Sequence, residues 1–583
     1  MPHTVTSDGD EFRIRDTDGL CWLQFGPPRT VLTASTHAGV MPVLREVERA
    51  VDRRGVWAAG WIAYEAAPAF DRALAVRSPA PGWPLAWFGL YDPPRRVPRA
   101  GPTADPAMPE WTPAIDAARY EAAIARIKDY IAAGDTYQVN FTLRLRAPFD
   151  GDPSGLFQAL DAAQGGRYGA FWRQGGLAIA SASPELFFSL DGARLVSRPM
   201  KGTARRGRWA ADDAAAAATL RASEKERAEN VMIVDMVRHD LGRVARTGSV
   251  RVERLFGLEP YPNVWQMTGT VAGETSAGIA DILTALFPAA SVTGAPKVRT
   301  MEIIAELEDS PRGVYSGAIG FVAPGRRAQF NVAIRTVAID RTAHAAEYGV
   351  GGGIVWDSTA EDEYAECRAK ASILAARRPH FELLETMRWT PGEGVFLLER
   401  HVGRLRESAA YFGWRVDESD VRAALDKTIP GLPSRPHRLR LRVGRDGTAS
   451  VDAEPFAPFV RPPRLGLARE PVDPSDVFLY HKTTRREVYD AARRGRPDCD
   501  DVLLWNDRGE VTESCIANVE VEIDGRSFTP PLACGLLPGT LRAERLARGQ
   551  TAERAVRRGD LHPSTRLRLV NSVRGVYEVE FVG

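Results

Sequence analysis

A chain of 583 residues is too long to fold around one hydrophobic core, and this length constrains the fold more than any other feature. Single cores stop growing at about 250–300 residues, so two or more domains are expected. Helix-like and strand-like segments alternate on both sides of a change in pattern near residue 378. We therefore predict two domains of mixed α and β structure, over residues 1–376 and 379–583.

The charge and apolar pattern argue against several classes of protein. The formal net charge is +1 without a strongly basic block, so nucleic acid is not an expected partner. No apolar run approaches the roughly 18 residues of a membrane span, and the polar N-terminus does not resemble a signal peptide. The five cysteines are scattered without a CxxC pair, which argues against disulfides or a zinc site and favours a cytoplasmic location.

Local patterns predict further elements. An apolar face from Tyr120 to Ile131 predicts a helix, and a long helix is expected from about residue 212 to 246. The stretch NVAIRTVAI is expected to form one buried strand. The proline-rich residues 78–113 are expected to form a loop between structured parts.

Lysine is rare in this chain, which makes each lysine informative. Of the 76 basic residues, seven are lysine, namely Lys128, Lys201, Lys225, Lys297, Lys370, Lys427 and Lys482. Arginine supplies surface charge but cannot readily act as a neutral amine nucleophile, whereas lysine can. A chain that uses so few lysines is therefore expected to place some of them where an amine is needed.

Two pairs of carboxylates have helical spacing. Glu226 and Glu229 lie three residues apart, as do Glu363 and Glu366, and Lys370 follows the second pair by one turn. Each pair therefore shares one face of its helix. Carboxylates from two helices suit Mg²⁺, which takes its other ligands from water and an anionic substrate. Spacing alone leaves open whether the two pairs meet or are solvated helix faces.

Four ordered motifs identify the first domain. KERAENVMIVDMVRHDLGRV, FPAASVTGAPKVRTMEIIAELE, RGVYSGAIGF and GVGGGIVWDSTAEDEYAECRAKA resemble the chorismate-utilising enzymes, the family of anthranilate synthase component I and aminodeoxychorismate synthase. The resemblance implies α+β structure, with two packed antiparallel sheets and surrounding helices. It also implies that the Mg²⁺ ligands are Glu226, Glu229, Glu363 and Glu366. The implied contacts to chorismate are Ser291, Tyr315, Arg335, Gly351, Gly352, Gly353 and Lys370.

The segment RPMKGTARRG separates members of this family. It resembles the PIKGT motif of aminodeoxychorismate synthases, whereas anthranilate synthases usually carry alanine where Lys201 stands. The resemblance implies that the Lys201 amine attacks C2 of chorismate, with Glu185 as general acid. Gln266 replaces the usual histidine, and Ser291 replaces a common threonine. Glu185 is therefore the better candidate acid.

The second domain carries two lysines. Lys427 lies at an apparent helix end, whereas Lys482 follows a strand-like apolar run and could lie in a pocket. ERHVGRL, YHKTTRR, LLWNDRGEVTESCIANVEV and GLLPGTLR resemble the class IV PLP enzymes, which include aminotransferases and aminodeoxychorismate lyase, an α/β fold of two subdomains. The resemblance implies that Lys482 binds pyridoxal 5′-phosphate and that Glu513 pairs with its pyridine nitrogen. The implied phosphate contacts are Arg404, Leu537 through its backbone, Thr540 and Ser572.

Together the resemblances imply synthesis of 4-aminobenzoate, by amination of chorismate and then PLP-dependent loss of pyruvate. The class IV motifs do not separate lyase from transaminase, and only the fused first domain favours the lyase. None of the cysteines has the setting of a glutaminase nucleophile, so ammonia is expected from a separate glutamine amidotransferase subunit. Class IV enzymes are commonly dimers, which implies a homodimer through the second domain as one option.

Three other interpretations stay open. The first domain could be anthranilate synthase-like and fused to a class IV aminotransferase, although Lys201 would have no purpose in that reaction. Aminodeoxychorismate could instead be an intermediate towards an aromatic amino acid, with the second domain transaminating a later product. Decay into binding modules is disfavoured, because both lysines and both acidic pairs are present. The product could serve folate or antibiotic synthesis.

Overall fold

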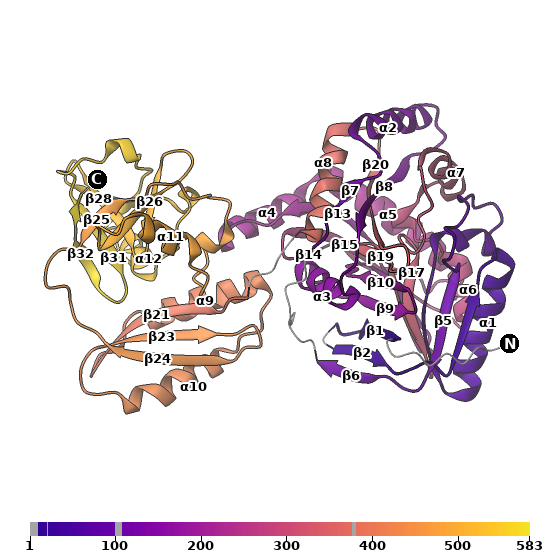
Figure 1. The fold of residues 1–583 in the computed structure, drawn as a ribbon, viewed down its shortest axis with the longest axis horizontal. Coiled ribbons are helices and arrows are strands. Elements are labelled where there is room, and N and C mark those ends of the chain that lie inside the picture. Colours follow the sequence, from indigo (N-terminus) through magenta and orange to yellow (C-terminus); the bar gives the residue numbers. More distant parts are fainter. Residues whose placement is uncertain (1–9, 20, 99–107, 376–379, 583) are drawn as a thin grey trace. The chain divides into compact units, whose positions relative to one another are not determined.

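A computed structural model describes residues 10–19, 21–98, 108–375 and 380–582 (Figure 1). The chain divides into two units, one of Met1–Arg205 with Ala217–Arg378 and one of Arg206–Ala216 with Pro379–Gly583. The sequence analysis placed residues 206–216 in the first domain, but the structure groups them with the C-terminal unit. Within that unit the Trp209 ring stacks on the Tyr480 ring at a centroid distance of 5.1 Å. Such a long-range contact leaves no local sequence pattern.

Two ten-stranded sheets of antiparallel pairs form the N-terminal unit. In spatial order the first consists of β16 (Gly294–Ala295), β8 (Gln138–Pro148), β20 (Ala345–Ile354), β19 (Thr336–Asp340), β10 (Leu177–Ser181), β9 (Ala170–Gln174), β1 (Glu11–Arg15), β2 (Cys21–Phe25) and β6 (Arg95–Pro98), with β7 (Thr112–Pro113) beside β8. The second consists of β13 (Met200–Arg205), β15 (Val264–Glu274), β12 (Arg194–Arg198), β11 (Leu186–Asp191), β18 (Arg327–Val332), β17 (Ala318–Ala323), β4 (Trp57–Ile62), β5 (Ala86–Tyr91) and β3 (Thr30–Ala34), with β14 (Arg251–Pro260) beside β15.

A tryptophan-rich core lies between these sheets. The Trp172 ring of the first sheet packs against the rings of Trp61 and Trp87 of the second, at centroid distances of 5.7 and 5.1 Å. Helices cover the outer faces, so the central strands of each sheet are buried on both sides, whereas β6, β7 and much of β14 are exposed (Figure 1). These helices are α1 (His37–Arg54), α2 (Ala117–Ala132), α3 (Pro153–Gln164), α5 (Glu224–Gly242), α6 (Ile279–Leu286), α7 (Lys297–Leu307) and α8 (Ala360–Ala371). The predicted architecture of two packed antiparallel sheets is confirmed.

Three local predictions were wrong. The proline-rich segment contains β5, whose six residues are all buried, because tertiary packing outweighs the flanking prolines. The long helix is divided into α4 (Ala210–Ala222) and α5 at Ser223, whose hydroxyl accepts a hydrogen bond from the Glu226 N–H. The single strand NVAIRTVAI is divided between β18 and β19, because Arg335 has a left-handed backbone with φ 53°.

The C-terminal unit contains two sheets. The smaller consists of β22 (Gly394–Val395), β21 (Leu383–Thr390), β23 (His437–Val443) and β24 (Ala449–Pro455), and it packs on α9 (Leu398–Phe412) and α10 (Glu418–Thr428). The larger consists of β30 (Ala552–Glu553), β29 (Arg526–Thr529), β28 (Asn518–Ile523), β27 (Val511–Ser514), β26 (Asp501–Trp505), β25 (Arg464–Leu467) and β33 (Glu580–Phe581), with β31 (Leu567–Asn571) beside β28 and β32 (Gly575–Glu578) beside β31. Helices α11 (Glu487–Gly495) and α12 (Thr540–Ala547) complete it.

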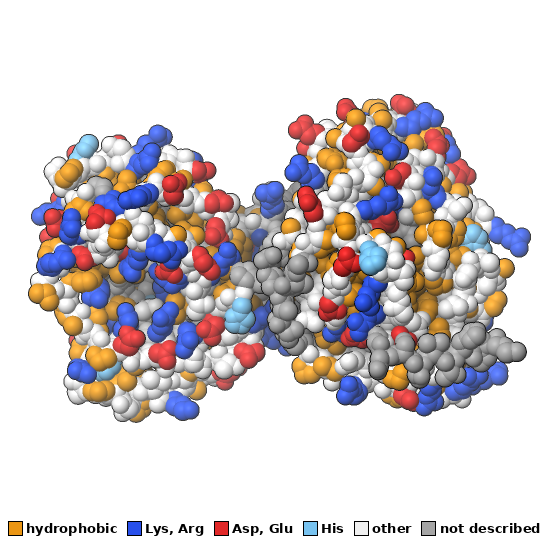
Figure 2. Space-filling view, viewed as in Figure 1, with side chains coloured by type: hydrophobic (Ala, Val, Ile, Leu, Met, Phe, Trp, Pro, Cys, Tyr) orange, Lys and Arg blue, Asp and Glu red, His pale blue; other side chains and the backbone are white. Residues whose placement is uncertain are grey.

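The surface carries mixed charge. On the face shown in Figure 2, acidic and basic side chains are interspersed over each unit. Such interspersion is typical of a solvated protein surface. Over the described ranges, no helix combines the length and the apolar character that a bilayer span requires.

Candidate functional site

The glycine run of β20 lies opposite β8. Gly351 pairs with Thr142 and Gly353 with Asn140 in the antiparallel register. A Cβ atom on Gly353 would collide with the Lys201 ammonium, and one on Gly352 would lie 2.8 Å from Glu363 Oε2. The glycines therefore let these side chains approach the strand closely.

Lys201 reaches this strand from the other sheet. The register of β13 shifts against β15 between Met200 and Thr203, so the chain bulges where Lys201 lies. The side chain of Lys201 is 16% exposed, and its Nζ lies 3.4 Å from Glu229 Oε2. Asn230 Nδ2 also donates a hydrogen bond to the Lys201 carbonyl, at 3.2 Å. The bulge and helix α5 together aim the amine at the glycine run.

The four predicted metal ligands surround this amine. Burial raises the pKa of Glu226, and the neighbouring Glu229 raises it further. Burial likewise raises the pKa of Glu363, whose Oε1 accepts a hydrogen bond from Ser358 at 2.6 Å. Burial acts to raise the pKa of Glu366, but the Lys370 ammonium, 2.6 Å away, outweighs it and lowers that pKa. Glu366 of α8 also raises the pKa of Glu226 of α5, so the two acidic pairs act on each other electrostatically.

The donor chemistry of this cluster fits a hard divalent cation. Carboxylate oxygens are the ligands that Mg²⁺ prefers, and crowded like charges are relieved by a cation. Over the described residues, however, no group of three or more histidine, cysteine or acidic side chains is arranged to hold a metal. Lys201 and Lys370 supply the positive charge among the carboxylates. The assignment of the four ligands therefore stays a prediction.

Glu185 is buried beside the same amine. Its side chain is 4% exposed, and Oε1 accepts a hydrogen bond of 2.6 Å from the Ser291 hydroxyl. Burial raises the pKa of Glu185 to about 7, against the opposing effects of Ser291 and Lys201. A carboxyl with this pKa is about half protonated at pH 7, so it can act as a general acid there. Ser291, a predicted substrate contact, therefore donates a hydrogen bond from its hydroxyl to Glu185, the predicted general acid.

The remaining predicted substrate contacts lie along β20. The Lys370 ammonium donates to the Gly351 carbonyl at 2.8 Å, and Arg335 donates to the Lys370 carbonyl. Tyr315 is buried, and its ring lies 5.1 Å from the Arg144 guanidinium. The structure brings these side chains together, but their roles stay predictions.

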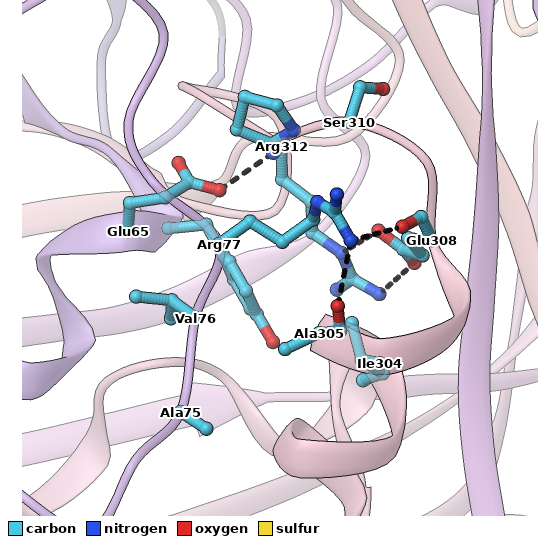
Figure 3. Close-up of a pocket in the computed structure, with 11 residues that line it drawn as sticks. Glu65, Ala75, Val76, Arg77, Ile304, Ala305, Glu308, Ser310 and Arg312 are labelled. Carbon is cyan, nitrogen blue, oxygen red and sulfur yellow. Dashed lines mark hydrogen bonds and ion pairs between the residues drawn. The ribbon is translucent and has the colours of Figure 1, made fainter.

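A buried ionic network lies beside β8, and Figure 3 shows Glu65, Glu308 and Arg312 of this network. Arg312 donates to Glu308 Oε1 at 2.6 Å and to the Asn140 carbonyl at 2.7 Å. Glu308 also accepts from the Thr142 N–H at 3.0 Å. Glu65 accepts from the Arg312 N–H at 2.7 Å, and burial raises the pKa of Glu65 to about 7. The adjoining cavity of about 10 Å³ has room for one water molecule.

Gln138 is a site residue that the sequence analysis missed. Its side-chain Nε2 and Oε1 are buried and have no hydrogen-bond partner among the described residues. A Cβ atom on Gly353 would lie 2.7 Å from Nε2, so the amide lies beside the glycine run. A buried amide without partners is available to a ligand. The only sequence signal was a polar residue at the start of an apolar strand.

Lys482 lines a cavity of about 380 Å³ in the C-terminal unit. The residues before it form a 3₁₀ turn (Val477–Leu479) and not the predicted strand, because the chain turns there towards β21. The Leu384 N–H donates to the Lys482 carbonyl at 3.0 Å, which fixes its backbone. Burial lowers the pKa of Lys482 to about 8, and the nearby Arg404 and Arg486 also lower it. About a tenth of the amine is therefore neutral at pH 7, far more than for an exposed lysine.

Glu513 lines the same cavity and is 3% exposed. Its carboxylate accepts hydrogen bonds from Tyr489 Oη at 2.8 Å, Asn518 Nδ2 at 3.1 Å and the Leu537 N–H at 3.1 Å. Burial nevertheless raises its pKa to about 7. A carboxyl held this firmly is suited to pair with a protonated ring nitrogen.

The predicted phosphate contacts also line this cavity. Arg404 pairs with the buried Glu385 at 2.5 Å, and Thr540 begins α12. Ser572 donates to the Thr386 carbonyl at 3.2 Å. The Leu537 N–H donates to Glu513, and its contact with the phosphate stays a prediction. An amine, a buried carboxyl, an arginine and a helix N-terminus around one cavity fit PLP.

Two family models match the chain. The description of the first is chorismate binding enzyme, and it matches residues 7–376. The description of the second is amino-transferase class IV, and it matches residues 382–581.

Three relatives place these matches in context. The chain is 42% identical over 254 residues to aminodeoxychorismate synthase component 1 of Bacillus subtilis, covering 43% of this chain and 54% of that protein. It is 39% identical over 318 residues to anthranilate synthase component 1 of Streptomyces coelicolor, covering 53% of this chain and 59% of that protein. The crystal structure of anthranilate synthase component I from Streptococcus pneumoniae aligns with a TM-score of 0.54 at 25% identity, covering 64% of this chain and 94% of that one. The chain thus spans little more than half the length of these two curated relatives.

Proposed function

We propose that this chain, which belongs to the chorismate binding enzyme family, makes 4-aminobenzoate from chorismate and ammonia. The first half-reaction would replace the C4 hydroxyl of chorismate by an amino group. The second would release pyruvate from the product. The match of residues 382–581 to the class IV aminotransferases supports a second half-reaction that depends on PLP.

In the first half-reaction Lys201 would act as the nucleophile. Its neutral amine would form a bond to C2 while both ring double bonds shift and the C4–O bond breaks. Glu185 would give its proton to the leaving hydroxyl, which departs as water. Ammonia would then form a bond to C4 while the C2–N bond breaks, which frees Lys201 and returns a proton to Glu185. The residues that would hold Mg²⁺ are Glu226, Glu229, Glu363 and Glu366.

The position of the Lys201 amine carries this proposal. It lies among the acidic pairs and in the space left by Gly353, and Glu185 acts on it electrostatically. A lysine held at the glycine run can react with a bound ring, whereas the alanine usual in anthranilate synthases could not. The relatives include both classes, so this side chain is the discriminating observation.

In the second half-reaction Lys482 would hold PLP and move a proton. PLP, when bound, supplies a sink for the electrons of a broken C–H bond. Lys482 would take the proton from C4 of the aminated ring while the C3–O bond to the enolpyruvyl group breaks, and the departing enolate would take up a proton to become pyruvate. Glu513 would face the pyridine nitrogen, and Arg404, Thr540 and Ser572 would surround the phosphate.

The ammonia would come from a separate glutamine amidotransferase subunit in the cytoplasm. The Bacillus subtilis relative is described as a component 1, which implies a second component for that protein. The purified chain should therefore use ammonium but not glutamine. A glutamine-dependent rate in the pure chain would contradict this.

A product assay tests the proposal. The purified chain is incubated with chorismate, Mg²⁺, PLP and ammonium chloride, and the products are separated by chromatography. We expect 4-aminobenzoate and pyruvate. If 2-aminobenzoate forms instead, the first half-reaction is that of an anthranilate synthase. If aminodeoxychorismate accumulates in the intact chain, the lyase assignment is wrong.

A further inference from the structure

The cavity around Lys482 contains more positive charge than its own acids neutralise. Seven cationic side chains line it, namely Arg404, Arg438, Arg440, Lys482, Arg486, Arg493 and Arg574. Its lining contains two acidic side chains, Asp490 and Glu513. Like charges in one cavity repel each other unless anions lie among them. The cavity is therefore built for anionic ligands.

Three of these arginines pair with acids that do not line the cavity. Arg404 pairs with Glu385 at 2.5 Å, Arg493 with Asp501 at 3.3 Å, and Arg438 with Glu454. These pairs fix the guanidinium groups and reduce their net charge. Within the described ranges, the other three arginines of the cavity, Arg440, Arg486 and Arg574, form no ion pair.

Arg440 and Arg574 have no ion pair among the described residues. The side chain of Arg440 makes no hydrogen bond within the described ranges either, and only its backbone is held, in strand β23. Arg574 donates to the Ala457 carbonyl at 3.1 Å, and its guanidinium lies 3.8 Å from the centre of the Phe459 ring. Burial lowers the pKa of Arg574, and the nearby Arg438 lowers it further. The charge of Arg574 is thus destabilised until an anion binds.

Arg440 and Arg574 line the same cavity as Lys482. Arg440 lies opposite Thr386 on β21, and Ser572, two residues before Arg574, donates to the Thr386 carbonyl at 3.2 Å. Leu384, two residues away on the same face of β21, donates its N–H to the Lys482 carbonyl. Two residues along a strand span roughly 7 Å. This is about the distance across a six-membered ring carrying substituents.

We propose that Arg440 and Arg574 form an anion subsite that binds a carboxylate of the substrate whose amine reacts at Lys482. The preferred ligand is a dicarboxylate amine of ring size, and this inference rests on the proposed function, because aminodeoxychorismate belongs to that class. Arg404 and the N-terminus of α12 would serve the cofactor phosphate, so the two anions have separate sites. Dicarboxylic amino acids also carry an amine and two carboxylates, so they are the competing class of ligand.

Steady-state kinetics test the subsite in the full chain loaded with PLP. Pyruvate release from purified aminodeoxychorismate is measured for Arg440→Gln and Arg574→Gln. We expect KM to rise by about tenfold or more in each, with kcat changed much less, since each variant loses charge-assisted hydrogen bonds to the substrate. The visible absorbance of bound PLP should be unchanged. Arg442→Gln is the matched control, because Arg442 is on the same strand, pairs with Asp452 at 2.8 Å and does not line the cavity.

An unchanged KM in both variants would overturn the proposal. Loss of PLP binding in either variant would also overturn it, because that arginine would then hold the cofactor phosphate. Faster conversion of glutamate or aspartate than of aminodeoxychorismate, lost in both variants, would keep the subsite but assign it to amino acid substrates.

A binding measurement separates this inference from the proposed function. The perturbation of PLP absorbance by isophthalate, a dicarboxylate, is compared with that by benzoate. If wild-type chain releases no pyruvate but prefers isophthalate through Arg440 and Arg574, the lyase assignment fails and the subsite stands. If the wild-type chain neither releases pyruvate nor prefers isophthalate, both the lyase assignment and the subsite fail.

Discussion

The two candidate sites are each organised around a lysine, but in opposite surroundings. Lys201 lies among carboxylates, 3.4 Å from Glu229, whereas Lys482 lies in a cavity lined by six arginines. An acidic cluster attracts a metal ion that can hold an anionic substrate. A basic cavity binds an anionic cofactor and an anionic substrate directly. The charge around each lysine therefore indicates which ligands bind beside it. At Lys201 these are a metal ion and an anionic substrate, and at Lys482 an anionic cofactor and an anionic substrate.

The largest expected effects come from removing either lysine. Lys201→Ala should lower amination, and Lys482→Ala should lower pyruvate release, each by about a thousandfold or more, because the nucleophile or proton carrier is lost. Each variant should retain the other half-reaction, measured with chorismate or with purified aminodeoxychorismate. Lys427→Ala, an exposed lysine of α10, is the control and should keep both activities. If one substitution abolishes both half-reactions in a folded chain, the separation of the two sites is wrong.

Replacing one carboxylate of the cluster around Lys201 should affect amination and leave pyruvate release unchanged. Glu363→Gln should raise the Mg²⁺ concentration needed for half-maximal amination by about 10- to 100-fold, because a charged ligand is lost. Titration of the amination rate with Mg²⁺ measures this. Glu361→Gln, at an exposed position of the same helix, should leave the titration unchanged. Equal titrations for the wild type and Glu363→Gln would contradict the ligand assignment.

The contribution of the general acid Glu185 to amination should fall as the pH rises. Burial raises the pKa of Glu185 to about 7, so its proton is present below pH 7 and lost above it. The ratio of the wild-type kcat for amination to that of Glu185→Gln should therefore fall about tenfold between pH 6 and pH 8. Both proteins need the neutral Lys201 amine, so this ratio isolates the proton of Glu185. A ratio that stays constant or rises across this range would exclude Glu185 as the acid.

The Lys482 amine should make the rate of PLP uptake rise with pH, and this is the smallest of the expected effects. Burial lowers the pKa of Lys482 to about 8, and the amine that reacts with PLP is the neutral form. The rate at which apo protein takes up PLP should rise about fivefold between pH 7 and pH 8 and level off above that. Stopped-flow absorbance measures this uptake. A rate that keeps rising towards pH 10 would mean that Lys482 titrates like an exposed lysine.

Much of the local structure followed from sequence patterns, and the failures have a common cause. The spacing of Glu226 and Glu229 correctly indicated one helix face, because helix period is a local property. The buried strand β5 was missed because the surrounding prolines suggest a loop, while its burial depends on neighbours distant in sequence. Gln138 was missed for the same reason, since only the approach of Gly353 shows that its amide faces the site.

By itself, the sequence determined the two-domain organisation, the family of each part and the scarcity of lysine that singled out Lys201 and Lys482. These follow from length, motif order and residue type, which need no coordinates. Tertiary structure alone decided that both acidic pairs act on Lys201, that residues 206–216 belong to the C-terminal unit, and that Arg440 and Arg574 line the cavity of Lys482. The reason is physical: these juxtapositions arise from sheet pairing and burial between segments far apart in the chain, and no local period encodes them.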